Sequence, residues 1–159
     1  MVESGGKWFY ITREWCCYVY RGNIIIILTQ KGRVILPAKF RDILGDCFYI
    51  TKGNDGCLFV YTTEGWEKLQ EKLSKLPLTN PNARRIVRYY TSGAMECVPD
   101  NNGRITLSQT LREFAGLEKE IVSIGCNDRA EIWSREKWKE YNSDPVDESL
   151  FEDMAEFGL

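Results

Sequence analysis

The sequence has 159 residues, of which 43% are hydrophobic and 28% are charged, and its net charge is -2. This length allows one ordinary domain or two very small ones, and the composition is typical of a soluble globular protein. The longest apolar run, residues 24–28, is far too short to span a bilayer. The N-terminus combines aromatic and charged residues and lacks the apolar segment of a signal peptide. We therefore predict a cytoplasmic protein with no membrane partner.

Histidine is absent from the sequence, and six cysteines are present. The lack of histidine removes the commonest general base and metal ligand, and with them most hydrolase mechanisms. No two cysteines have the Cys-x-x-Cys spacing of a zinc or redox site, and Cys47, Cys57, Cys97 and Cys126 lie in or beside strand-like stretches. We predict buried free thiols, with disulfides or zinc as the alternative, and no metal, cofactor or small-molecule substrate.

The charges are unevenly distributed along the chain. Residues 21–141 contain 19 Lys and Arg against 15 Asp and Glu, whereas the two ends together contain 2 against 8. A mildly basic body with acidic ends is compatible with a polyanionic partner and equally with a plain solvated surface. The charge distribution alone does not decide between them.

An internal repeat gives the strongest signal in the sequence. Residues 29–45 return 71 positions later as residues 100–116, with five of 17 positions identical, whereas ordinary residue usage predicts about one. The identical pairs are Gly32/Gly103, Arg33/Arg104, Leu36/Leu107, Arg41/Arg112 and Gly45/Gly116. The chain therefore contains two related units.

In chain order, each unit predicts a strand, a polar turn ending in Gly-Arg, a second strand, a short helix and two more strands. The expected strands are residues 24–28, 34–36, 48–51 and 57–61 in the first unit and residues 95–98, 105–107, 120–124 and 130–133 in the second. Pro37 and Ser108 are suited to begin the short helices, and Gly45 and Gly116 to end them with positive φ.

The segments outside the repeats also have readable patterns. Apolar residues at helical spacing predict a helix over residues 66–76, which Pro77 stops, and a second helix is expected after Asn80-Pro81. After residue 142 the chain is acidic. Five apolar residues there predict a short amphipathic helix that docks weakly or frays: Val146, Leu150, Phe151, Met154 and Phe157.

One unit has too few elements to close a core, so we expect the two to interlock. The predicted fold is mixed α+β, mainly β: a pseudo-two-fold barrel of two β-turn-β-α-β-β repeats with short helices. The expected divisions are an N-terminal extension (1–18), repeat 1 (19–66), a helical connector (67–93), repeat 2 (94–141) and an acidic tail (142–159), with both repeats in one structural domain.

The Gly-Arg turns are the candidate binding site. Glycine permits a tight turn, and arginine projects a planar fork that can hold O6 and N7 of guanine, so Arg33 and Arg104 are the base-reading candidates. The turn residues Lys31, Gly32, Asn102 and Gly103 belong to the same site, with Lys31 neutralising phosphate. Arg41 and Arg112 are weaker candidates for phosphate contacts. The alternative is ordinary turn glycines beside arginines that are solvated or paired with acids such as Asp100.

A second group of charges is assigned differently. Arg84, Arg85 and Arg88 are spaced to share a helical face, and Glu96 and Asp100 are close enough in sequence to pair with them. We predict structural or inter-subunit ion pairs here, with a further DNA-binding stripe as the alternative. An enzyme would have to build its site from Glu96, Cys97 and Asp100 without histidine, a phosphate cradle or a metal cluster, so we predict no catalytic residue.

Over about residues 20–141 the sequence resembles the MraZ family of bacterial transcription regulators, which consist of two AbrB-like swapped-hairpin units. The matching features are Lys31-Gly32-Arg33 with Pro37 and Arg41, Asn80-Pro81 with the three arginines, Ala94-Met95-Glu96-Cys97, Asp100 and Gly103-Arg104. The resemblance implies a ring-forming, nucleoid-associated protein that binds double-stranded DNA and represses the division and cell-wall gene cluster containing its own gene.

A head-to-tail ring presents its turns in one direction, so direct repeats upstream of its own gene are expected rather than palindromes. Two other interpretations stay open: an AbrB-type or antitoxin-type regulator of other promoters, and a ring-shaped scaffold without DNA binding. The family's first motif usually begins with Asp, where this chain has Thr29, so we expect the first turn to be held less rigidly. Residues 1–18 have no counterpart in the family.

Overall fold

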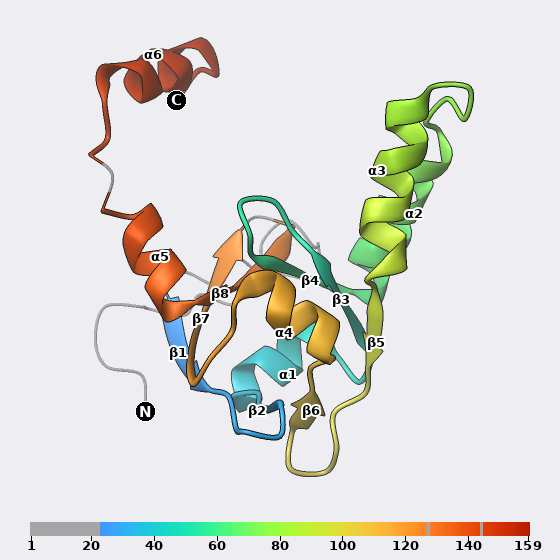
Figure 1. The fold of residues 1–159 in the computed structure, drawn as a ribbon, viewed down its shortest axis with the longest axis vertical. Coiled ribbons are helices and arrows are strands. Elements are labelled where there is room, and N and C mark those ends of the chain that lie inside the picture. The colour runs from blue at the N-terminus through green and yellow to red at the C-terminus, as the bar shows by residue number, and fades with distance from the viewer. Residues whose placement is uncertain (1–22, 127, 144) are drawn as a thin grey trace.

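The computed structural model describes residues 23–126, 128–143 and 145–159; the predicted extension 1–18, with Cys16 and Cys17, lies outside these ranges. Eight strands and six helices follow one another in these ranges (Figure 1). The strands are β1 Asn23–Ile27, β2 Arg33–Ile35, β3 Phe48–Lys52, β4 Leu58–Thr62, β5 Met95–Cys97, β6 Arg104–Thr106, β7 Glu120–Cys126 and β8 Arg129–Ser134. The helices are α1 Ala38–Leu44, α2 Thr63–Ser74, α3 Pro81–Ser92, α4 Gln109–Ala115, α5 Arg135–Tyr141 and α6 Glu148–Glu156.

The two repeats exchange strands with each other. Six strands form one antiparallel sheet in the order β1-β7-β8-β4-β3-β5, and β2 pairs with β6 in a separate two-stranded ribbon. The first strand of each repeat therefore pairs with the third strand of the other repeat. If β1, β2, β3 and β4 are exchanged with β5, β6, β7 and β8, the order of the six-stranded sheet reads the same in reverse, and the ribbon still pairs β2 with β6. This symmetry confirms the predicted mixed α+β fold with a pseudo-two-fold relation between the repeats.

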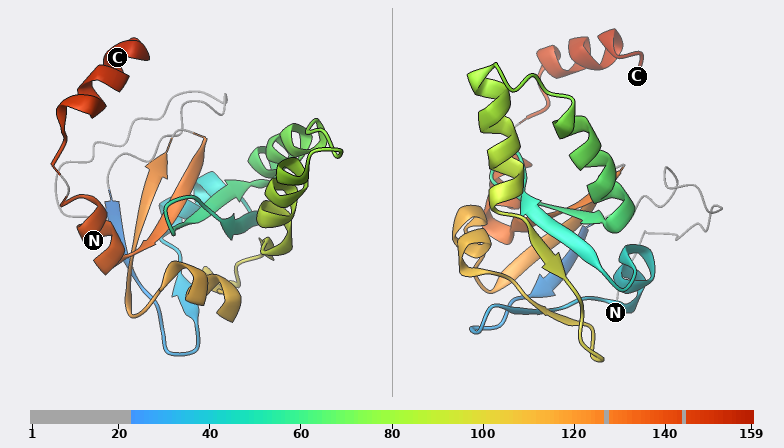
Figure 2. Two further views of the ribbon diagram at one scale, coloured as in Figure 1. Left: turned by 45° about the horizontal axis from the view of Figure 1, so that its top comes forward. Right: turned by 90° about the vertical axis from the view of Figure 1, so that its right-hand side faces the viewer.

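The main core lies between the sheet and the layer formed by the ribbon, α1 and α4 (Figures 1 and 2). Because strand side chains alternate, β2 and β6 each direct one residue inward, Val34 and Ile105, and expose the residues on either side. The largest fully buried side chains include Phe48, Leu58 and Leu111. Burying such apolar surface from both repeats is what holds the interlocked units together.

A second, aromatic cluster covers the opposite face of the sheet. It contains Phe59 and Tyr61 from β4 and Trp133 from β8, with Trp66 from α2 and Trp138 from α5 packed against it. The alternation of β4 explains both clusters, since Leu58 and Val60 face the main core while Phe59 and Tyr61 face the aromatic one.

The short helices begin and end largely as predicted. The Ser108 hydroxyl accepts a hydrogen bond from the Leu111 amide at 3.3 Å at the start of α4, and Pro37 precedes α1. Gly45 and Gly116 have the expected positive φ. The connector helix α2 begins three residues earlier than expected because Thr62 caps it, and Asn80 caps α3.

Candidate nucleic-acid interface

The ribbon brings the two predicted base-reading arginines onto one surface. Its register pairs are Arg33 with Thr106, Val34 with Ile105 and Ile35 with Arg104. Since Val34 and Ile105 point into the core, Arg33 and Arg104 share the exposed face with Ile35 and Thr106. Two residue steps separate the arginines along the ribbon, a distance of about 7 Å. The pairing between repeats thus joins two turns that are 71 residues apart in the sequence.

The second turn holds its arginine through Asp100. Asp100 Oδ1 accepts hydrogen bonds from the amides of Asn102 and Arg104, both at 2.9 Å, and Oδ2 accepts one from Arg104 Nε at 2.8 Å. The backbone hydrogen bond from Arg104 is the largest of the causes that lower the pKa of the Asp100 carboxyl. The Arg104 guanidinium is therefore oriented before any ligand arrives, although both side chains remain solvent-accessible.

The first turn has the same backbone and fewer restraints. The Thr29 hydroxyl accepts one hydrogen bond, from the Arg33 amide at 3.1 Å. Within the described residues, the Arg33 guanidinium forms no ion pair. The side chain of Arg33 is therefore less restrained than that of Arg104, as the replacement of the usual Asp by Thr29 predicted.

Each turn is supported by the helix of the other repeat. Gly32 and Gly103 are buried and have φ of +73° and +72°. A Cβ at Gly103 would lie 2.7 Å from Arg41 Nε, and one at Gly32 would lie 2.9 Å from Arg112 Nε. These arginines therefore pack directly against the turn glycines, a position that favours a supporting role over the phosphate contacts predicted from the sequence.

The two supporting arginines differ in one hydrogen bond. Arg112 Nε donates to the Leu107 carbonyl at 3.2 Å. Arg41 Nε is buried without a hydrogen-bond partner among the described residues. Backbone hydrogen bonds complete the symmetric support, since the Leu36 amide donates to the Gly103 carbonyl and the Leu107 amide to the Gly32 carbonyl, each at 2.9 Å.

A pocket of about 430 Å³ adjoins the ribbon and is lined by Arg33, Glu96, Asp100 and Arg104, among others. The structure thus brings four of the predicted residues together. Glu96 accepts long hydrogen bonds from Cys47 Sγ at 3.6 Å and from the Tyr49 hydroxyl at 3.5 Å. Neither carboxylate is bonded to the arginines of α3: Asp100 is bonded by Arg104, and the partners of Glu96 are Cys47 and Tyr49.

The arginines of α3 lie elsewhere, on the α2–α3 hairpin that projects from the body (Figure 1). Arg84 Nη1 donates to the Leu78 carbonyl at 2.8 Å, and Arg85 and Arg88 are exposed. No ion pair joins any of the three to another described residue. An intrachain ion-pair role with Glu96 or Asp100 is therefore not seen in the described part of the chain.

Four of the six cysteines lie in the described residues, and two of them are buried. Cys47, Cys57, Cys97 and Cys126 are free; Cys57 and Cys97 are buried, and the other two are half-buried rather than buried as predicted. Burial raises the pKa of the Cys57 and Cys97 thiols to about 12, so both are protonated at neutral pH and are poor nucleophiles. No group of three potential metal ligands occurs in the described ranges.

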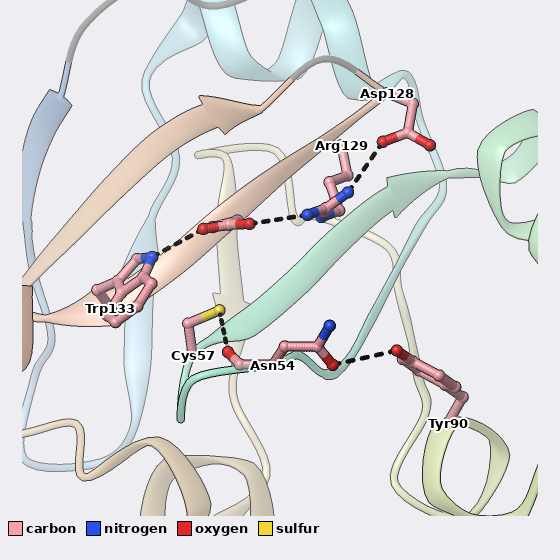
Figure 3. A network of polar contacts seen from close by, with 7 residues as sticks. Asn54, Cys57, Tyr90, Asp128, Arg129 and Trp133 are labelled. Atoms are coloured by element: carbon pink, nitrogen blue, oxygen red, sulfur yellow. Dashed lines mark hydrogen bonds and ion pairs between the residues drawn. The ribbon is translucent and has the colours of Figure 1, made fainter. Parts of the chain in front are cut away.

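A polar network runs from the surface residue Asp128 to the buried residues Glu131 and Trp133 beside the aromatic cluster (Figure 3). Arg129 bridges Asp128 and Glu131, each at 3.1 Å, and its guanidinium lies 4.1 Å from the centre of the Phe59 ring. Trp133 Nε1 donates to Glu131 at 3.0 Å. The buried Glu131 carboxylate thus accepts hydrogen bonds from a guanidinium and an indole. Across those residues that the structure describes, no helix is long and apolar enough to cross a membrane.

The interlocked repeats and their paired Gly-Arg turns define a two-repeat swapped-hairpin protein. A family model described as "MraZ protein, putative antitoxin-like" matches residues 25–89 and again residues 91–157. Relatives named Transcriptional regulator MraZ include one from Clostridium acetobutylicum, 53% identical over 83% of this chain and 94% of the relative. Another, from Moorella thermoacetica, is 47% identical over 89% of this chain and 100% of the relative. The chain therefore belongs to the MraZ family, whose relatives are named as transcriptional regulators, a non-enzymatic class.

Sequence reasoning missed part of the site. Ile35 and Thr106 share the exposed ribbon face with the arginines, and the alternation of their short strands could have revealed this. The packing of Arg41 and Arg112 against the glycines of the opposite repeat had no sequence signal, because it depends on how the repeats interlock.

Proposed function

We propose that this protein is a DNA-binding transcriptional regulator that reads bases with Arg33 and Arg104. The carrying observation is that both side chains lie on the exposed face of one two-stranded ribbon. The major groove of B-DNA admits such a ribbon, and each arginine fork can donate two hydrogen bonds to guanine. Their offset of about 7 Å corresponds to about two base-pair steps, so one ribbon contacts base pairs that are two steps apart.

The remaining turn residues supply affinity in this proposal. Lys31 and Asn102 are exposed at the tips of the two turns, where they approach the phosphate backbone. Gly32 and Gly103 give the turns their tight backbone. Arg41 and Arg112 position the turns, and their contact with phosphate is secondary because their guanidinium groups pack against the glycines.

Substitution of the ribbon arginines tests this mechanism. Arg33→Ala and Arg104→Ala should each weaken operator binding by about 1–3 kcal/mol and relax sequence discrimination. Arg33→Lys and Arg104→Lys keep the charge and lose the fork, so discrimination should fall while the salt dependence of binding is retained. Lys139→Ala, an exposed change on α5, serves as the charge control. Unchanged operator affinity in both folded alanine variants would remove the mechanism.

The proposed assembly is a head-to-tail ring that binds direct repeats upstream of its own gene and represses the division and cell-wall cluster at the nucleoid. Successive subunits in such a ring present their ribbons in one direction. They reach the same groove face when the repeats lie about 10 base pairs apart or when the DNA bends. Inserting about half a helical turn between repeats should abolish most cooperative binding, and a full turn should restore part of it. Footprints that show equal binding after the half-turn insertion would overturn this arrangement.

The antitoxin-like description of the matching family favours one second candidate, an antitoxin-type regulator of other promoters. A salt-dependent gel shift on the DNA upstream of its own gene separates the two. Binding there supports the first proposal, and binding confined to other promoters supports the second. A ring-shaped scaffold would bind neither.

A further inference from the structure

The pocket beside the ribbon lies between an edge of the sheet and strand β6. Its volume is about 430 Å³, and its lining includes Met95 and Glu96 of β5 and Arg104 and Thr106 of β6. Strand β5 is the last strand in the order of the sheet, and β3 is its only partner among the described strands. A strand at the edge of a sheet offers unpaired backbone N–H and C=O groups. The pocket therefore has a wall that can form hydrogen bonds, and its volume is typical of small-molecule sites.

Strand β5 ends early because a proline follows it. In repeat 1, Leu28 comes directly after β1, and its amide donates a hydrogen bond to the Lys119 carbonyl at 2.8 Å. Pro99 occupies the equivalent position of repeat 2 and has no N–H, so this hydrogen bond cannot form there. Val98, between β5 and Pro99, is 67% exposed and lines the pocket together with Ile105. The pocket thus adds apolar surface to its polar wall.

Four charged side chains line the pocket, two of each sign: Arg33, Arg104, Glu96 and Asp100. Arg104 and Asp100 pair with each other at 2.8 Å. Neither Arg33 nor Glu96 forms an ion pair with any described residue. The hydrogen bonds that Glu96 accepts come from a thiol at 3.6 Å and a phenol hydroxyl at 3.5 Å, both long and from neutral groups. The pocket therefore contains one cation and one anion whose charges no described partner compensates.

We propose that this pocket binds a small zwitterion, an amino acid or a short peptide, and that the bound ligand competes with DNA. The guanidinium of Arg33 pairs with the ligand carboxylate, and the carboxylate of Glu96 accepts hydrogen bonds from the ligand ammonium group. An apolar side chain of the ligand contacts Val98 and Ile105. A ligand with a single charge compensates only one of the two groups. The competition rests on the proposed function, in which Arg33 reads bases, because one guanidinium cannot hold a ligand carboxylate and a guanine together.

Isothermal titration calorimetry tests the binding site with defined probes. The probes are L-leucine, the dipeptide L-leucyl-L-alanine, and the same dipeptide with either an acetylated amino terminus or an amidated carboxyl terminus. Each blocked dipeptide lacks one charge and should bind at least about tenfold more weakly than the free dipeptide. Comparison of L-leucine with the free dipeptide distinguishes an amino acid from a peptide as the ligand.

A matched pair of variants assigns the ammonium contact. Glu96→Gln keeps the size of the side chain and removes its charge, so the free dipeptide should lose its advantage over the acetylated form. Glu118→Gln, which neutralises an exposed carboxylate outside the pocket lining, should retain that advantage. Operator titrations then test the competition. With the free dipeptide at about ten times its dissociation constant, the operator dissociation constant of the wild type should rise at least about tenfold. Glu96→Gln should bind the operator as tightly as the wild type does and should no longer respond to the same dipeptide concentration.

The outcomes separate this inference from the proposed function. If neither L-leucine nor the free dipeptide binds, or if the acetylated dipeptide binds as tightly as the free one, the zwitterion site is wrong while operator binding stands. If the free dipeptide binds and the operator affinity does not change, the competition is wrong. A protein that binds no operator overturns the proposed function and with it the competition, whereas the calorimetry still decides whether the pocket binds a zwitterion.

Discussion

In both Gly-Arg turns, the glycine amide donates to the carbonyl of the residue three positions earlier, at 2.9 Å in the first turn and 2.8 Å in the second. The turns differ at that earlier residue, since Asp100 accepts three hydrogen bonds through its carboxylate and Thr29 accepts one through its hydroxyl. Backbone shape therefore comes from the glycine and from the opposite repeat, whereas arginine orientation comes from the residue that begins the turn. Both repeats therefore share the backbone shape of the turn, whereas only the second repeat has a carboxylate that orients its arginine.

The largest effect on stability is expected when the glycine that both turns share is replaced. The positive φ of Gly103 alone should make Gly103→Ala lower the free energy of unfolding by about 1–2 kcal/mol. Displacement of the Arg41 side chain by the added Cβ should increase this loss further. Gly116→Ala is the matched control, since its φ is +62° and its added Cβ meets only the end of the Lys137 side chain at 3.3 Å and beyond. Urea unfolding measures both variants.

A double-mutant cycle sharpens this prediction. In an Arg41→Ala background, Gly103→Ala should cost less than in the wild type, whereas the cost of Gly116→Ala should be unchanged. Equal losses at positions 103 and 116, with no coupling to Arg41, would show that the arginine does not support the turn.

The supporting arginines provide the next test. Arg112→Met removes a hydrogen bond to the Leu107 carbonyl, a loss of about 1 kcal/mol. Arg41→Met keeps most of the packing and removes a buried Nε that has no partner in the described structure, so it should cost less than Arg112→Met. Urea unfolding of the two variants side by side gives the difference. The reverse order would mean that Arg41 contributes more to its turn than the geometry indicates.

A smaller effect on stability is expected when the first residue of the first turn is changed to the aspartate of the second. Thr29→Asp supplies the first turn with a carboxylate in the position that Asp100 occupies in the second, so it should orient Arg33 and raise the melting temperature slightly. Thr29→Ala should lower the free energy of unfolding by no more than about 1 kcal/mol, because it removes one exposed hydrogen bond. Thermal melts rank the three proteins, and a less stable Thr29→Asp variant would show that the first turn cannot accept the second turn's restraint.

Much of this architecture could be predicted because the elements of each repeat are determined by residues that are close together in the sequence. The alternation around Val34 and Ile105, the capping hydroxyl of Ser108 and the positive φ of Gly116 all depend on neighbouring residues. The convergence of Arg33 and Arg104 on one ribbon depends on pairing between strands 71 residues apart. A repeat indicates that such pairing exists without giving its partners.

The contacts of long polar side chains were the least predictable part of the site. Arg41 and Arg112 looked like surface cations, yet each packs against a glycine of the other repeat. Asp100 was a candidate partner for the α3 arginines and, in the alternative interpretation of the turns, for the turn arginines; it is bonded by Arg104. Such side chains are long enough to reach several partners, so their contacts follow from the assembled backbone rather than from sequence spacing.

The smallest predicted effect is a pH response confined to the second turn. The Asp100 pKa lies below its ordinary value, chiefly through the backbone hydrogen bond from Arg104, so its contribution to stability is complete above the unfolded-state pKa and is lost as pH falls through the folded-state pKa. In an acid titration followed by amide NMR, Asn102 and Arg104 should shift together at a pH below the ordinary value for aspartate. The Arg33 amide should not follow, because its partner Thr29 does not titrate. The Thr29→Asp variant should transfer the same response to Arg33, and a matching shift of Arg33 in the wild type would instead reveal a general loss of the ribbon.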